Sequence, residues 1–244
     1  MSWTTVSVRS ASVIAVLFVA AALLILTACS KEPVTTRSKI YVSFPERIDT
    51  GCRDGKAKMF DQCGDQAELF STALGRAKAE SKVLLVEFGA EWCIWCHVFD
   101  AHVNGERDRF QYTYGSPDEP EARYTETFEE GAGTDANEAN SLRDFVAATF
   151  VVVHIDAEFA PNGFGVLEST GAAAHYASSI PFVFTVDEHG RFAGKFNHDA
   201  VEKRRDTPTD WYRGYDRKGL MAQLTAMRDA ARAPLETAAA SSSP

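Results

Sequence analysis

Two short apolar segments constrain the fold of this chain more than any other feature. The first covers residues 83–88 and the second residues 150–156, and both are rich in valine. A mainly apolar run of this length predicts a strand buried on both faces. Two such strands separated by a helical stretch form a parallel pair with a right-handed crossover. The chain is therefore expected to be an α/β protein.

The segments around these strands predict a mixed sheet with helices on both faces. A helix is expected from about Asp65, which can cap it, to Ser81, and another begins near Cys93. Residues 182–186 and 191–196 flank a turn and predict an antiparallel hairpin. Residues 201–215 are expected to be a charged, aromatic connection. Apolar residues at helical spacing predict a last amphipathic helix: Leu220, Leu224 and Met227.

The N-terminal residues have the pattern of a secretory signal. A single positive charge is followed by a run without charges, residues 11–28, that ends in small residues. The ending Leu26-Thr27-Ala28-Cys29 resembles the lipobox of bacterial lipoproteins. This resemblance implies a signal peptide over residues 1–28 and a lipid on Cys29, which anchors the chain at the periplasmic face of a bacterial membrane. Ser30 implies the outer membrane in a Gram-negative cell. The alternative is a transmembrane anchor.

The rest of the chain divides by composition. The predicted parts are a tether and cysteine-containing loop over residues 29–64, with the tether ending near residue 47, a folded domain over residues 65–233, and a disordered tail over residues 234–244. Residues from about 113 to 140 are strongly acidic, which predicts a solvated insertion after the helix that begins near Cys93. The net charge is −9 and no run of Lys and Arg supplies a basic face, which argues against a nucleic-acid partner.

A pair of cysteines follows the first strand. Trp92 precedes Cys93-Ile94-Trp95-Cys96, and Cys93 is expected to lie at a helix N-terminus. Amide groups and the helix dipole stabilise a thiolate there, and the thiolate is the species that attacks a disulfide. Cys96 lies one helical turn further on and can reach the sulfur of Cys93. Cys93 is therefore the predicted nucleophile and Cys96 the predicted resolving thiol.

Residues 86–96 resemble the active-site strand and turn of the thioredoxin-like superfamily, and Ser179-Ile180-Pro181 resembles its cis-proline loop. The similarity extends over roughly residues 65–230. It implies a thioredoxin-like fold and thiol–disulfide exchange, with Glu87 moving the proton of the second cysteine. It also implies that Pro181 is cis and exposes the backbone of Ile180 to an extended substrate. The residues expected to bind substrate are Trp92, Ile94, Trp95, Ile180 and Pro181.

The chain departs from thioredoxin itself in three respects. Gly89 stands in place of a tryptophan, Ile94-Trp95 stands in place of Gly-Pro, and the acidic insertion has no counterpart. Two of the implied roles have simpler alternatives. Glu87 could face solvent at a strand end, and Pro181 could be an ordinary trans proline.

The remaining cysteines suggest a second pair. Cys52 and Cys63 lie in a glycine-containing loop of a chain expected outside the cytoplasm, which favours a structural disulfide. The alternative is a second redox pair that relays electrons to Cys93 and Cys96. His154, on the second predicted strand, is expected to be a core or edge histidine.

Two other functions fit parts of the same motif. Cys93 to His97 form the C-x-x-C-H pattern of c-type haem attachment, and Cys93 and Cys96 with His97 or His102 could carry copper(I). The strand context and the distant Ile180-Pro181 favour disulfide exchange, so no cofactor and no metal are expected. The expected partners are protein thiols and disulfides outside the cytoplasm. Since no second catalytic domain is evident, a separate redox partner is expected to recharge the pair, and the direction of transfer stays open.

Overall fold

A mixed five-stranded sheet organises the part of the chain that the computed structural model describes. The described residues are 39–107, 109–114, 124–129, 135–207 and 210–233. The strand order is β1-β5-β2-β6-β7. The parallel strands are β1 (Ser43–Phe44), β5 (Phe150–Asp156) and β2 (Val83–Gly89), and the antiparallel ones are β6 (Phe182–Val186) and β7 (Phe192–Lys195). The predicted α/β class with a mixed sheet is confirmed, and the arrangement is compatible with a thioredoxin-like fold.

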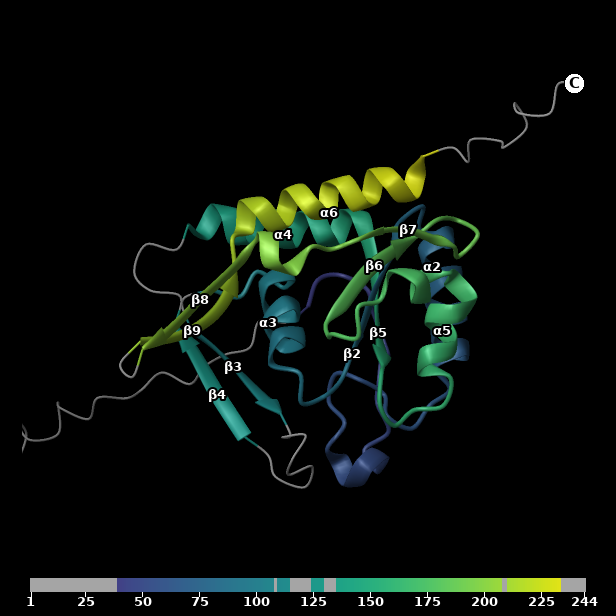
Figure 1. The fold of residues 1–244 in the computed structure, drawn as a ribbon, viewed down its shortest axis with the longest axis horizontal. Coiled ribbons are helices and arrows are strands. Elements are labelled where there is room, and N and C mark those ends of the chain that lie inside the picture. The colour runs from purple at the N-terminus through teal and green to yellow at the C-terminus, as the bar shows by residue number, and fades with distance from the viewer. Residues whose placement is uncertain (1–38, 108, 115–123, 130–134, 208–209, 234–244) are drawn as a thin grey trace, which may run out of the picture. The chain divides into compact units, whose positions relative to one another are not determined.

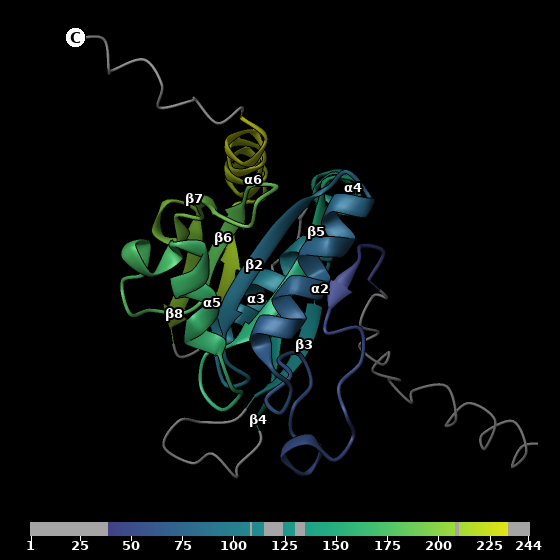
Figure 2. The same ribbon diagram turned by 90° about the vertical axis from the view of Figure 1, so that its right-hand side faces the viewer.

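Helices cover both faces of this sheet. They are α2 (Gln66–Ala79), α3 (Ile94–Val103), α4 (Ala136–Thr149), α5 (Gly163–Thr170) and α6 (Arg217–Arg232). In Figure 1, α2 and α5 lie on one side of the central strands and α3 lies on the other. Figure 2 shows α2 and α5 in front of the strands. Asp65 caps α2 as predicted, because its side chain accepts hydrogen bonds from the amides of Ala67 and Glu68.

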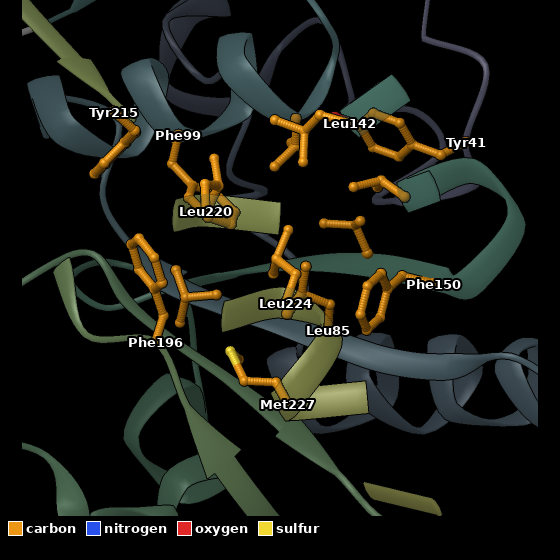
Figure 3. Close-up of a cluster of buried hydrophobic side chains, with 14 of the residues drawn as sticks. Tyr41, Leu85, Phe99, Leu142, Phe150, Phe196, Tyr215, Leu220, Leu224 and Met227 are labelled. Carbon is orange, nitrogen blue, oxygen red and sulfur yellow. The ribbon is translucent and has the colours of Figure 1, made fainter. Parts of the chain in front are cut away.

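The pleat of the central strands divides the core into two clusters. Leu85 and Val152 point to the side of α3, α4 and α6, where they pack with Phe99, Leu142 and Leu220 (Figure 3). Residues with the opposite parity on β2 and β5 pack against α2 and α5. The polar residues Glu87 and His154 have the same parity as Leu85 and Val152, so they face α3.

Three short 3₁₀ helices and two further hairpins complete the described chain. The 3₁₀ helices are η1 (Cys52–Gly55), η2 (Ala172–His175) and η3 (His198–Ala200), and the hairpins are formed by β3 (Arg109–Tyr114) with β4 (Tyr124–Glu129) and by β8 (Glu202–Thr207) with β9 (Asp210–Tyr215).

The second hairpin corrects the prediction of a connection over residues 201–215. The charged side chains along β8 hide the strand in the sequence, but a ladder is held by backbone groups, and the buried Tyr215 anchors its end. The described part of the predicted acidic insertion contains regular secondary structure. Part of it pairs as β3 and β4, and α4 begins within it, capped by Asp135.

The end of the predicted tether also belongs to the fold. From Lys39 to Phe44 the chain runs along the sheet, with Tyr41 and Phe44 buried and Ser43 paired with Val152. These buried side chains and the strand pairing hold the segment, although its apolar residues form no periodic pattern. The predicted signal peptide, Cys29 and the C-terminal tail lie outside the described residues. Among the described helices, none combines the length and the apolar character needed to cross a membrane.

Candidate active site

Cys93 and Cys96 are joined by a disulfide at the start of α3, with an S–S distance of 2.21 Å. Cys93 is the N-cap of the helix, and its Sγ accepts a hydrogen bond from the Cys96 amide at 3.2 Å. This amide and the helix dipole stabilise negative charge on the Cys93 sulfur after reduction. Cys96 is fully buried, whereas 3% of Cys93 remains exposed. Cys93 is therefore the better placed of the two sulfurs for attack on another molecule.

A loop from the N-terminal segment covers the buried side of this disulfide. Phe60 is fully buried and packs with Cys93 and Cys96. The carboxylate of Glu91 holds the loop, because it accepts hydrogen bonds from the backbone amides of Lys58 and Met59. The sequence did not indicate these roles of Phe60 and Glu91, because a contact between residues some thirty positions apart leaves no local pattern.

Gly89, at the end of β2, makes room for this packing. A Cβ at Gly89 would lie 2.6 Å from the Cys96 Sγ and 2.8 Å from the Phe60 ring. Such distances are well inside van der Waals contact. The absence of a side chain at Gly89 therefore leaves space for the Cys96 sulfur and the ring of Phe60.

Most of the predicted substrate-binding residues surround the disulfide. Trp92, Trp95 and Ile180 pack against the cluster of Phe60 and the two cysteines. The indole nitrogen of Trp92 donates to Glu158 at 2.9 Å, which fixes its ring. Ile94 lies apart from this set, because its side chain packs against the main core.

The Ile180–Pro181 peptide bond is cis, as predicted. Together with Trp95, this loop lines a groove of about 580 Å³ that extends to His198 and Glu202. Neither cysteine lines this groove, but Trp95 and Ile180, which do, also pack against the cluster that contains Cys93 and Cys96. A chain segment in the groove would therefore lie near the disulfide.

Glu87 is fully buried, so the alternative in which it faces solvent is wrong. Its Oε2 lies 3.1 Å from Nδ1 of His154, which is its neighbour in the register of β2 and β5. Burial raises the pKa of Glu87 well above its usual value, and the nearby Asp100 raises it further. A raised pKa makes a carboxyl group a better proton acceptor when it is ionised, so Glu87 is suited to general acid–base catalysis.

Cys52 and Cys63 form the predicted disulfide, with an S–S distance of 2.09 Å. Cys52 is buried and Cys63 is exposed. The bond closes the loop that carries Phe60 and so helps to hold this ring over Cys96.

The histidines near the motif are engaged in other contacts. Nε2 of His97 lies 2.7 Å from the Glu91 carbonyl oxygen. His102 uses both ring nitrogens, since Nδ1 lies 2.9 Å from the Val98 carbonyl and Nε2 accepts from the Tyr215 amide at 3.2 Å. Among the described residues, the clusters of three potential metal ligands do not include Cys93 or Cys96.

Neither a protein-family model nor a curated protein sequence matches this chain.

Proposed function

We propose that this protein is a thiol–disulfide oxidoreductase of the thioredoxin-like superfamily. The observation that carries the proposal is the Cys93–Cys96 disulfide, which caps an α-helix on the same side of the sheet as the buried carboxyl of Glu87. The cis Ile180–Pro181 bond and the adjacent groove support it, because they offer an extended chain a place beside the sulfur.

The proposed reaction transfers two electrons from the reduced pair to a protein disulfide. The Cys93 thiolate attacks one substrate sulfur, the substrate S–S bond breaks, and the released sulfur takes up a proton. Cys96 then gives its proton to Glu87 and attacks the Cys93 sulfur. The bond between Cys93 and the substrate breaks, the second substrate thiol leaves, and the Cys93–Cys96 disulfide remains.

The proposed setting is outside the cytoplasm. The resemblance of residues 26–29 to a lipobox supports a lipid on Cys29 and attachment to the periplasmic face of a bacterial membrane. The partners would be proteins with thiols or disulfides, as for a reductase or isomerase, together with a redox protein that recharges the pair. The hydrogen bonds of His97 and His102 favour this function over copper delivery or haem attachment.

A turnover assay tests the proposal. The full chain, in detergent, is supplied with a small dithiol and a model protein disulfide, and the rate of substrate reduction is compared among three proteins. Wild type should accelerate the reaction, and Cys93→Ser and Cys96→Ser should not sustain turnover. A wild-type rate equal to that of the dithiol alone would exclude the function. A haem spectrum or stoichiometric copper in the purified protein would favour the alternatives.

A further inference from the structure

A line of polar side chains connects the buried Glu87 with the surface. His154 Nδ1 lies 3.1 Å from Glu87 Oε2, and on the other side of the ring Nε2 lies 3.6 Å from Oδ1 of Asp100. The same Oδ1 accepts hydrogen bonds from Lys39 at 2.6 Å and from the hydroxyl of Tyr41 at 2.9 Å. Side chains from β2, β5, α3 and the N-terminal segment thus form one line of polar groups.

This line begins next to Cys96. Gly89 and Glu87 are two positions apart on β2, so they point to the same face of the sheet. Gly89 lies directly under the Cys96 sulfur. On α3, Asp100 is four residues after Cys96 and therefore lies on the same helix face. The ring of Phe60, which packs on the disulfide, also contacts His154 with ring centroids 5.6 Å apart.

Exposure increases steadily along the line. The exposed fraction of the side chain is 0% for Glu87, 3% for His154, 17% for Asp100 and 31% for Lys39. Among the described residues, Glu87 Oε1 and His154 Nε2 have no hydrogen-bond partner. Two buried polar atoms left unpaired cost free energy, which a purely structural network would avoid. Such an arrangement is better suited to a group that changes its protonation.

The ionisation of these groups is compatible with proton transfer. Burial lowers the pKa of His154 to about 3, so its ring is neutral and can accept at one nitrogen while it donates at the other. Burial alone would raise the pKa of Asp100, but the charge of Lys39 and the hydrogen bonds from Lys39 and Tyr41 outweigh it and lower the pKa below its usual value. The other titratable groups that influence Glu87, His154 or Asp100 are His97 on α3 and Tyr215 on β9.

We infer that His154 is a positioning residue that passes the proton of Cys96 from Glu87 to Asp100 and thence to solvent. The inference rests on the proposed function, because it concerns the step in which Cys96 closes the disulfide. No feature of the sequence distinguishes His154 from an ordinary core histidine.

The transfer balances without any further reactant. Cys96 Sγ–H gives its proton to the Glu87 carboxylate and forms the bond to Cys93 as the substrate sulfur leaves as a thiolate, which takes a proton from water. Glu87 then protonates Nδ1 of His154, and Nε2–H passes its proton to Asp100. Nε2 and Oδ1 must approach by roughly 0.6 Å to reach ordinary hydrogen-bond distance. Asp100 releases the proton to water. The neutral ring then carries its proton on Nδ1, and this proton must move to Nε2, with no net gain or loss, before the next turnover.

Single-turnover oxidation of the reduced full chain by one equivalent of a chromogenic aromatic disulfide separates the two chemical steps. Every protein in the series carries Cys29→Ser, so that Cys93 and Cys96 supply the free thiols. The first equivalent of coloured thiol reports attack by Cys93, and the second reports attack by Cys96. His154→Gln should slow the second phase by about tenfold or more and leave the first unchanged. That phase should also acquire a solvent deuterium isotope effect, which a structural role would not produce.

Two further variants make the test decisive. Asp100→Asn interrupts the line at its exposed end and should slow the second phase even if His154→Gln folds poorly. His102→Gln removes an equally buried histidine of α3 whose nitrogens are bound by backbone groups, and should leave the second phase unchanged. Equal slowing of both phases, or no slowing in either relay variant, would overturn the inference. A wild-type protein that releases no coloured thiol would instead refute the proposed function.

Discussion

Replacing Gly89 by alanine tests whether the disulfide and Phe60 pack as described. The added Cβ would lie 2.6 Å from the Cys96 sulfur and 2.8 Å from Cζ of Phe60. Gly89 does not adopt a positive φ, so the backbone tolerates alanine and the penalty comes from these contacts. Overpacking of this kind costs about 1–3 kcal/mol. The loss of glycine flexibility returns about 0.5–1 kcal/mol, which leaves a net destabilisation of up to about 2.5 kcal/mol.

The melting temperature should consequently fall by up to roughly 10 °C for a domain of this size. The effect should be larger in the oxidised protein, because the bond to Cys93 prevents the Cys96 sulfur from rotating away. By linkage, the disulfide becomes easier to reduce, and its potential should rise by about 20 mV for each kcal/mol of difference. Thermal unfolding of both redox forms and titration against a glutathione buffer measure these quantities.

Gly75→Ala is the matched control. Gly75 lies in α2, and a Cβ there meets nothing within 4 Å. This change should stabilise the protein by about 0.5–1 kcal/mol and leave the potential unchanged. If Gly89→Ala is as stable as Gly75→Ala in both redox forms, the packing of Cys96 and Phe60 against β2 is wrong.

Three further predictions concern pH and the second disulfide. Burial raises the folded-state pKa of Glu87, so its contribution to stability should be full below about pH 4.5 and be lost as the pH rises through that raised pKa. In urea titrations at several pH values, Glu87→Gln should make this decline less steep. An unchanged decline would contradict a buried carboxyl group at this position. Burial lowers the pKa of His154 to about 3, so its contribution to the free energy of unfolding should be full above about pH 6.5 and fall by about 1 kcal/mol per pH unit below that. An equally steep fall in His154→Gln would show that another group causes the loss of stability. Replacing both Cys52 and Cys63 by serine should cost about 2–3 kcal/mol in thermal unfolding, whereas a negligible cost and a potential equal to that of Cys93–Cys96 would favour an electron relay.

The framework of the fold could be predicted because it depends on local patterns. The apolar runs gave β2 and β5, the cap at Asp65 gave the start of α2, and the flanking turn gave the hairpin of β6 and β7. The cysteine spacing likewise predicted that Cys93 would begin α3.

What escaped prediction depends on contacts between distant segments. Tyr41 joins the core from a segment without periodicity, and Phe60 reaches the disulfide only because Glu91 holds its loop. The strand β8 is masked by its charges, since backbone pairing leaves little trace in side-chain pattern. His154 looked like a structural histidine because the sequence cannot show that Glu87 and Asp100 lie on either side of its ring.

Trapping of the mixed disulfide tests the central claim most directly. Reduced Cys96→Ser and Cys93→Ser proteins are each mixed with a peptide that contains one disulfide, quenched with acid, and weighed by mass spectrometry. The account predicts a stable covalent adduct of one peptide on Cys93 in the first variant and little or none in the second, because the remaining Cys96 sulfur is buried. An adduct confined to Cys93→Ser would reverse the assignment of the nucleophile, and no adduct in either variant would contradict disulfide exchange at this site.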